Sequence, residues 1–325
     1  MTNNGNIFYA GSGFSGIVAP STLYGLHEGG MYLSGPSGIV RLEGEGNEAM
    51  LNALESAGAL IPGSQSATKA VNELLEDPRT SRTVSYLLCA AHSCEDLLED
   101  MARLKKSRVL VFGCGGIGST TSLLLAGSGI EHLTITDGDI IEESNLNRQL
   151  FWRRSDIGQH KAKVLRDVLL EKFPTMTVNT VLKNLGLTDI EERISEGYDA
   201  IVVSADEPAT LASNCKKLAD KYKIPVVSGG YLHRMCMTNF YDGGMQKPFE
   251  PLIPNEDNLS YGQFEWKRLP GGIMPSFGPS NFALASMLAS SVVAVLARKT
   301  LAPPKQHSII WDANKLPLSF NTIIG

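Results

Sequence analysis

The chain has 325 residues, of which 43% are hydrophobic and 19% charged, and this balance excludes a disordered or fibrous protein. The formal charge of −5 argues against a nucleic-acid partner, because the chain would repel phosphate backbones. The N-terminus does not resemble a secretory signal, and the longest apolar segment, 281–297, is too short to span a bilayer comfortably. We therefore expect a cytoplasmic protein with a buried helix over that segment and no membrane contact.

The first 75 residues differ in character from the rest of the chain. Short glycine-flanked strands are expected in IFYAGSG, GMYLSG and GIVRLEG, followed by a helix with periodic apolar residues around 48–57. The next stretch, IPGSQSATKA, carries Pro, Gly and Ser and is a plausible boundary. We expect a small α+β domain over residues 1–75 and a second domain over 76–325.

Between Arg108 and Tyr241, short β-branched runs alternate with amphipathic stretches, which is typical of βαβ units in a parallel sheet. The clearest helix is expected from near Ser155 to Phe173. The segment 242–272 is rich in Pro and Gly, and we expect it to form a lid on the substrate side. The expected strands are 108–112, 132–136, 176–182, 199–203, 224–228 and 237–241. The predicted fold class is α/β, with a doubly wound, Rossmann-like and mainly parallel sheet.

A glycine-rich turn, G-C-G-G-I-G, follows the first of these strands and supplies the candidate phosphate-binding residues Gly113, Gly115, Gly116 and Gly118. Without side chains the backbone can approach a phosphate, and the following helix N-terminus supplies N–H donors. Asp137 ends the next strand, where a carboxylate can accept hydrogen bonds from ribose hydroxyls. These residues alone leave a dinucleotide-dependent dehydrogenase as a full alternative to an ATP-binding enzyme.

The residues after Asp137, D-G-D-I-I-E-E-S-N-L-N-R-Q, end in a polar cluster that has no role in hydride transfer. Together with GCGGIGS before them, and G-Q-H-K-A-K at 158–163 and S-A-D at 204–206 after them, they form an ordered set. This set resembles the ubiquitin-activating, ThiF and MoeB superfamily over about residues 78–295. The resemblance implies a Rossmann-like homodimer that uses ATP to adenylate a carboxylate.

The resemblance also implies roles for single residues. Asp137 would bind the ribose, and Arg148 and Lys161 would neutralise the triphosphate. Asn145 and Gln149 would complete the polar wall of the nucleotide site, and Asp206 would bind Mg²⁺. Asp139 either belongs to this site or caps a structural turn. The chemistry agrees, since a carboxylate that attacks an anionic phosphate needs positive charge and positioning. Taken singly, Arg148 and Lys161 would be interpreted as ordinary surface residues.

Upstream, D-P-R-T-S-R-T at 77–83 resembles the R-x-x-R motif of the family. In that motif the second arginine reaches across the dimer into the active site of the partner. Arg82 is therefore the candidate for an arginine supplied in trans, with Arg79 beside it. An ordinary arginine at the start of a helix is nearly as simple an interpretation, because the motif is short.

The five cysteines form no CxxC pair, so no structural zinc is expected, and 242–272 has no cysteine that could receive the acyl group. VFGCGGIG, SADEPA and the G-G-Y after VVS resemble the peptide-modifying branch of the superfamily, which serves microcin C and pantocin A biosynthesis. Members of this branch carry an N-terminal winged-helix-like domain that captures the leader of a precursor peptide as an added strand. Residues 1–75 would fit that domain.

The expected function is therefore the ATP- and Mg²⁺-dependent adenylation of a side-chain or C-terminal carboxylate of a ribosomal precursor peptide. The absent zinc cysteines favour the pantocin type, which activates glutamate side chains for cyclisation. Two alternatives stay open: activation of the C-terminus of a ubiquitin-like sulfur carrier, and a non-catalytic binding protein that kept the fold. The sulfur-carrier alternative is weakened because such enzymes seldom need an additional N-terminal domain. The binding-protein alternative is weakened because it would not need every charged position of a nucleotide site.

Overall fold

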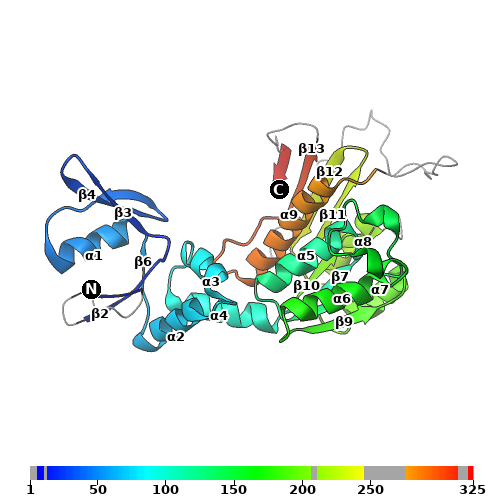
Figure 1. Cartoon of the computed structure of the whole chain (residues 1–325), viewed down its shortest axis with the longest axis horizontal. Helices are drawn as coiled ribbons and strands as arrows, with labels where there is room; N and C mark the ends of the chain where they lie inside the picture. Colours follow the sequence, from blue (N-terminus) through cyan, green and yellow to red (C-terminus); the bar gives the residue numbers. More distant parts are fainter. Residues whose placement is uncertain (1–5, 11–12, 206–210, 245–274, 314–320, 325) are drawn as a thin grey trace. The chain divides into compact units, whose positions relative to one another are not determined.

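The computed structural model describes residues 6–10, 13–205, 211–244, 275–313 and 321–324 (Figure 1). The chain divides into two compact units. The first comprises 1–106, 127–129 and 294–303, and the second comprises 107–126, 130–293 and 304–325. The first unit thus continues past residue 75, and the division of function at that residue stays a prediction.

The first unit begins with two small antiparallel sheets and a helix. β1 (Ile7–Ala10), β2 (Gly13–Val18) and β6 (Leu60–Ile61) form one sheet, and β3 (Leu23–His27), β4 (Gly30–Gly35) and β5 (Gly38–Arg41) form the other. Helix α1 (Gly46–Ser56) packs its buried Ala53 and Leu54 against Phe8 and Leu33. The strands expected in IFYAGSG, GMYLSG and GIVRLEG are confirmed as β1, β4 and β5, of which β1 and β5 are shorter than predicted, and the expected helix is confirmed as α1. β2, β3 and β6 were not predicted.

Three further helices complete the first unit: α2 (Gln65–Glu76), α3 (Ser81–Leu88) and α4 (Cys94–Lys106). Ser64 caps α2 by accepting a hydrogen bond from the Ala67 N–H at 3.3 Å. These helices share one apolar core with β2 and β6, formed by Ile17, Ile61, Val71, Val84 and Leu97 among others. The helices and the small sheet are therefore parts of one folded body.

The second unit is built on an eight-stranded sheet in the order β14-β13-β12-β11-β10-β7-β8-β9. The neighbouring strands β11, β10, β7, β8 and β9 run parallel to one another. The pairs β11–β12, β12–β13 and β13–β14 are antiparallel. The bounds are β7 (Arg108–Phe112), β8 (His132–Thr136), β9 (Thr177–Val181), β10 (Ala200–Val203), β11 (Val226–Leu232), β12 (Met235–Tyr241), β13 (His307–Asp312) and β14 (Asn321–Ile324). All six strands predicted for this region are present.

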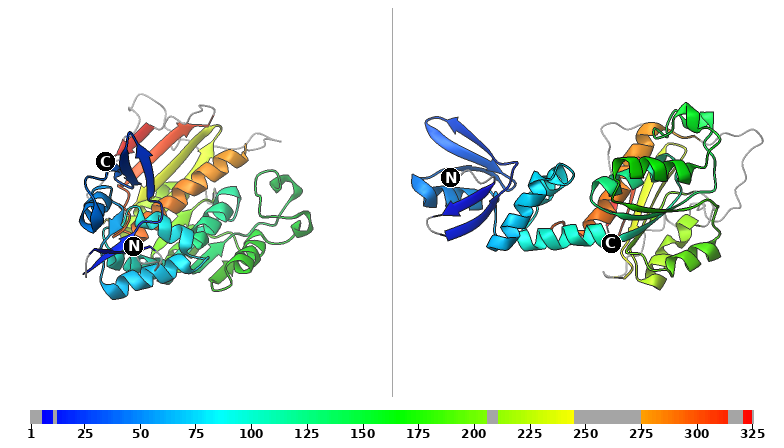
Figure 2. Two further views of the ribbon diagram at one scale, coloured as in Figure 1. Left: turned by 60° about the vertical axis from the view of Figure 1, so that its left-hand side comes forward. Right: turned by 60° about the horizontal axis from the view of Figure 1, so that its bottom comes forward.

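Helices cover both faces of this sheet, as the predicted doubly wound fold requires. They are α5 (Gly116–Gly127), α6 (Lys161–Lys172), α7 (Leu187–Ile194), α8 (Leu211–Tyr222) and α9 (Gly278–Leu296). α7 and α8 pack on the face that carries Leu110 and Ile201. Leu288 of α9 lies 3.1 Å from the position of a Cβ on Gly229, on the opposite face. Figures 1 and 2 show α9 beside α5.

Two helix boundaries refine the predictions. The helix expected from near Ser155 begins only at Lys161, because Gly158 takes a positive φ of 90° and a short 3-10 turn, 154–156, precedes it. The buried helix expected over 281–297 is confirmed as α9. With a mean hydropathy of 1.5 and 56% burial, α9 is long and apolar enough to cross a membrane, but a core helix meets the same criteria.

Candidate active site

The glycine loop lies between β7 and the N-terminus of α5, and some of its glycines have no room for a side chain. Gly113 takes a positive φ of 90°, and a Cβ there would lie 3.0 Å from the Ala205 nitrogen. A Cβ on Gly118 would lie 1.8 Å from the Gly113 oxygen. At Gly115, by contrast, the nearest atom would be Gln149 Nε2 at 3.9 Å. Gly113 and Gly118 thus allow the tight turn, while Gly115 presents bare backbone in the manner of a phosphate-binding loop.

Asp137 braces this loop from the end of β8. Its Oδ2 accepts a hydrogen bond from the Cys114 N–H at 2.6 Å, and its Oδ1 accepts one from the Asp139 N–H at 2.8 Å. Burial raises the pKa of the Asp137 carboxyl above its ordinary value, although the two N–H donors and Lys161 oppose the shift. Each carboxylate oxygen has a further lone pair that could accept from a ribose hydroxyl.

Lys161 and Asp139 form an ion pair beside Asp137. Lys161 opens α6, and its Nζ lies 2.8 Å from Asp139 Oδ2. The Lys161 N–H also donates to the Asp139 carbonyl, so backbone and side chain hold the two segments together. The Lys161 side chain is 10% exposed, whereas that of Asp139 is 57% exposed. An ammonium group has three donors, so Lys161 could keep Asp139 and also bind a phosphate oxygen.

The S-N-L-N-R-Q segment folds as a 3-10 turn, η1 (Glu143–Asn145), followed by a second turn. The buried Asn145 accepts the Glu142 N–H at 3.1 Å through Oδ1, and its carbonyl accepts the N–H groups of Arg148 and Gln149. Gln149 is also buried and accepts from Trp152 Nε1 at 2.7 Å. These two amides therefore shape the turn that carries Arg148.

Arg148 is only partly held in place. Its Nη1 donates to the Ser144 carbonyl at 2.5 Å and to Asn147 Oδ1 at 3.0 Å. Within the described part of the chain, its Nε and Nη2 make no hydrogen bond. Those donors are free to bind an anion, as expected of a phosphate ligand.

Two predicted residues are not brought into this arrangement by the structure. Asp206, the predicted Mg²⁺ ligand, lies outside the described residues, as does most of the predicted lid. Arg82 lies on α3 in the first unit, where it is exposed and has no ion pair with any described residue. Its neighbour Arg79 is held by Asp77, with N···O distances of 2.8–3.2 Å. Of the two arginines, Arg82 is the one that is available for a partner.

Sequence reasoning missed Asn281, on the first turn of α9. Its Nδ2 lies 2.2 Å from where a Cβ on Gly116 would be, so the amide occupies the space that this glycine leaves open. Gly278 of the same turn lies against Arg148, whose Cα is 3.8 Å from a Cβ placed on that glycine. The segment was interpreted as a buried apolar helix, and no local motif around Asn281 indicated a contact with the glycine loop.

Two cysteines, Cys114 and Cys236, are buried and poorly suited to act as nucleophiles. Cys114 lies within the glycine loop but is fully buried, and burial raises the pKa of its thiol well above the ordinary value. Burial also raises the pKa of Cys236 on β12. The thiolate is the reactive form, so both thiols are poor acyl acceptors. Across the described residues, no group of three His, Cys, Asp or Glu side chains could hold a metal ion.

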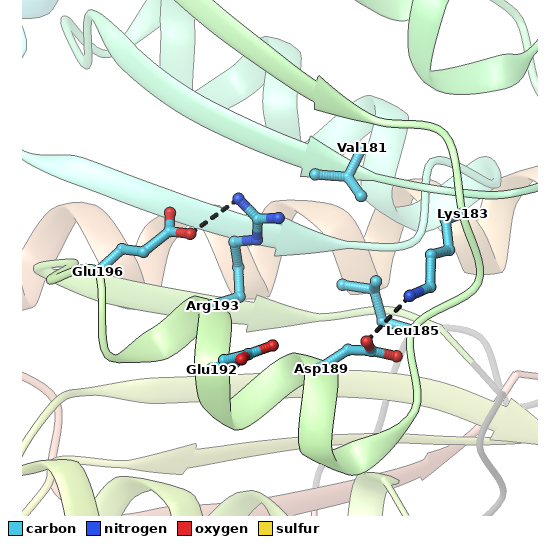
Figure 3. A pocket seen from close by; sticks show the side chains of 7 residues that line it. All are labelled: Val181, Lys183, Leu185, Asp189, Glu192, Arg193 and Glu196. Atoms are coloured by element: carbon cyan, nitrogen blue, oxygen red, sulfur yellow. Dashed lines mark hydrogen bonds and ion pairs between the residues drawn. The ribbon is translucent and has the colours of Figure 1, made fainter.

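A separate cavity of about 250 Å³ lies between the end of β9 and α7 (Figure 3). Its cations are already paired: Lys183 with Asp189, and Arg193 with Glu196, both at 2.9 Å. The lining residues are Val181, Lys183, Leu185, Asp189, Glu192, Arg193 and Glu196. Three carboxylates against two lysine or arginine side chains make this cavity a poor phosphate site, so the candidate site remains the one around the glycine loop.

The fold is shared with solved structures of E. coli MccB and of PaaA. The MccB structure with AMPCPP and MccA has a TM-score of 0.71 and 20% identity, covering 95% of this chain and 96% of that one. PaaA has a TM-score of 0.68 and 20% identity, covering 94% and 98%. At this level of identity the likeness concerns the fold, and it confirms the predicted Rossmann-like architecture.

Sequence comparison adds relatives of a different kind. Adenylyltransferase and sulfurtransferase MOCS3 of Culex quinquefasciatus is 35% identical over 161 residues, which are 49% of this chain and 36% of that protein. The probable molybdopterin-synthase adenylyltransferase of Porphyra purpurea is 33% identical over 167 residues, or 50% of this chain and 42% of that protein. The aligned part thus spans less than half the length of these curated relatives. The ThiF family model matches residues 94–323, most of the chain and nearly all of the second unit, and the chain therefore belongs to the ThiF family.

Proposed function

We propose that this protein is an ATP-dependent enzyme that adenylates a carboxylate of a peptide substrate. The observation that carries the proposal is the convergence of Lys161, Asp139 and Arg148 with Asp137 around a glycine loop of the ThiF family. The loop offers backbone donors and the helix N-terminus of α5, and the two cations offer charge. A dehydrogenase would not require these cations beside the phosphates.

In the proposed reaction an oxygen of the substrate carboxylate attacks the α-phosphorus of ATP. A new P–O bond forms, the bond to the β-phosphate oxygen breaks, and pyrophosphate leaves with that electron pair, which yields an acyl adenylate. Both partners are anions, so Lys161 and Arg148 would lower the barrier by neutralising charge that develops on the phosphates. Asp137 would orient the ribose while it holds the Cys114 N–H in the loop.

Mg²⁺ would join the phosphates in this scheme. It prefers oxygen ligands and is commonly bound by one or two carboxylates together with the substrate phosphates. The exposed carboxylate of Asp139, beside Lys161, fits such a role. Asp206 remains the second proposed ligand on the basis of its S-A-D motif. When bound, the ion would supply positive charge at the leaving pyrophosphate.

The peptide substrate is proposed on the basis of the first unit. β3 is an edge strand of its sheet, and all five of its residues are exposed. They include Tyr24 and Leu26, each 78% exposed. An exposed edge with apolar side chains is typical of a strand that pairs with another strand, and a leader peptide could bind in this way. The solved structures of MccB with the peptide MccA support this class of substrate.

The resemblance to the peptide-modifying branch of the superfamily suggests a more specific reaction, in which glutamate side chains of a ribosomal precursor are activated for cyclisation, as in pantocin A. The second candidate is a ubiquitin-like sulfur carrier, which the MOCS3 relative favours. We further propose a homodimer in the cytoplasm, with Arg82 supplied in trans.

ATP-pyrophosphate exchange tests the adenylation step. Radioactive pyrophosphate should enter ATP when the substrate carboxylate is present, because the acyl adenylate forms reversibly. A candidate precursor encoded near the gene for this protein and a purified sulfur-carrier protein would be compared as substrates. Exchange with neither one, by a protein that also fails to bind ATP, would refute the proposal.

The peptide site is tested by Tyr24→Ser and Leu26→Ser on β3, with Ile39→Ser on the opposite edge strand as the control. All three side chains are exposed, so the changes should leave the unfolding temperature nearly unaltered. We expect the β3 variants alone to lose affinity for the precursor, measured by fluorescence anisotropy, while ATP binding is unchanged. Equal precursor affinity in all three variants would remove β3 from the proposal.

A further inference from the structure

The buried amide of Asn281 lies at the glycine loop and has no hydrogen-bond partner among the residues that the structure describes. Asn281 is 2% exposed, and its side chain makes no hydrogen bond with any residue that the structure describes. Buried polar side chains are nearly always hydrogen-bonded, because leaving one unsatisfied is costly. A ligand bound at the glycine loop could supply the partner that this amide does not find among the described residues.

The surroundings of Asn281 show which kind of ligand this is. The amide occupies the space beside Gly116, the first residue of α5, and Gly278 brings the start of α9 against Arg148. The first turns of two long helices, of 12 and 19 residues, thus meet beside the backbone of Arg148. Helix N-termini and arginine all favour an anion. An acidic ligand such as a phosphate matches every one of these groups.

We propose that Asn281 is a nucleotide-binding residue whose Nδ2 donates a hydrogen bond to a phosphoryl oxygen of ATP bound at the glycine loop. This inference rests on the proposed function, and it adds α9 as a second element of the phosphate site. Gly116 has a definite part in it, because any side chain there would collide with the Asn281 amide at 2.2 Å. The glycine therefore admits the donor as well as the phosphate.

Two variants separate binding from structure. Asn281→Leu has nearly the same shape and no donor, and Asn281→Asp replaces the donor by a negative charge. The apo amide has no hydrogen bond to lose, so Asn281→Leu should unfold at the same temperature as the wild type or higher. We expect the dissociation constant for ATP, measured by calorimetry, to rise about ten- to hundredfold in Asn281→Leu. It should rise further in Asn281→Asp because of charge repulsion.

Asn239→Leu is the matched control. Asn239 is also buried, but its Nδ2 donates to Ser228 Oγ at 3.1 Å and its Oδ1 accepts from Ser308 Oγ. This variant should lower the unfolding temperature of the apo protein, and it should leave the ATP affinity of the folded fraction unchanged. We thus expect Asn281→Leu to lose ATP affinity without losing stability, and Asn239→Leu to lose stability without losing ATP affinity.

Titration with AMP locates the contact. A defect of Asn281→Leu that persists with AMP assigns the hydrogen bond to the α-phosphate, and a defect confined to ATP assigns it to the β- or γ-phosphate; both results support the proposal. ATP affinity equal to wild type in folded Asn281→Leu and Asn281→Asp would overturn it and leave the proposed function intact. A wild-type protein that does not bind ATP would overturn both.

Discussion

Lys161 provides the sharpest test of the proposed site, because the structure predicts different effects on folding and on activity. In Lys161→Met the unbranched stem keeps its packing at the start of α6, and only the charge is removed. The ion pair that is lost joins Nζ to Asp139 Oδ2 at 2.8 Å, and the Asp139 side chain is 57% exposed. Pairs with such an exposed partner contribute roughly 0–1 kcal/mol, so the free energy of unfolding should change by about 1 kcal/mol or less.

The effect on the reaction should be much larger. One preorganised group that stabilises transition-state charge contributes about 3–4 kcal/mol, which corresponds to roughly a hundred- to thousandfold in rate. ATP-pyrophosphate exchange at saturating substrate should therefore fall by that factor in Lys161→Met. Thermal unfolding of the same samples in the absence of ATP measures the change in protein stability.

Lys163→Met is the control, since Lys163 lies on the same helix but is exposed and makes no ion pair with the described residues. It should match the wild type in both assays. The reasoning would be refuted if Lys161→Met, folded and as stable as the control, retained exchange within about twofold of it. A large loss of stability in Lys161→Met would instead show that its role is structural.

Three further predictions concern other parts of the site. Burial raises the pKa of the Asp137 carboxyl above its ordinary value of 3.8. As the pH falls, Asp137 should therefore be protonated, and ATP affinity should decline, at a higher pH than for an ordinary aspartate. An identical decline in Asp137→Asn would refute this. The raised pKa also means that ionised Asp137 lowers stability above the unfolded-state pKa, and that part of this loss is recovered as the pH falls. Gly118→Ala should destabilise the fold by about 1–3 kcal/mol in chemical denaturation, because its Cβ would lie 1.8 Å from a backbone oxygen, whereas Gly115→Ala should fold normally and bind ATP more weakly. If Arg82 acts in trans, mixed dimers of Arg82→Ala and Lys161→Met subunits should recover exchange activity, and no recovery after proven subunit exchange would count against the crossed arrangement.

The parallel sheet and the glycine loop could be predicted because their determinants are local. A buried parallel strand is a short apolar run such as RVLVF, and β7 and β8 have the predicted bounds. β3 could not be predicted in this way, because L-Y-G-L-H has a central glycine and no alternation of buried and exposed positions. Its exposed apolar side chains are unusual for a strand and are understood only once its edge position is known.

In the candidate site too, residues within a local motif could be predicted, whereas a residue brought in by helix packing could not. The motif indicated Lys161 and Asp139, and their 2.8 Å contact gives Asp139, left open by the sequence, a definite neighbour. Asn281 lies 165 residues after Gly116 in the sequence, and only the packing of α9 beside α5 brings the two together. A contact of this kind leaves no mark in the local sequence.

The organisation of the first unit bears on how the substrate can be identified. Val71, Val84 and Leu97 of α2, α3 and α4 share their core with Ile17 and Ile61 of the small sheet. Removing residues 1–70 would expose that core and cut α2, so lost activity in such a truncation would report unfolding as readily as lost peptide binding. The edge strand β3 lies outside this core and can be altered without disturbing it. Single changes on β3 can therefore distinguish a peptide substrate, whose binding they would weaken, from a carrier protein that is recognised elsewhere.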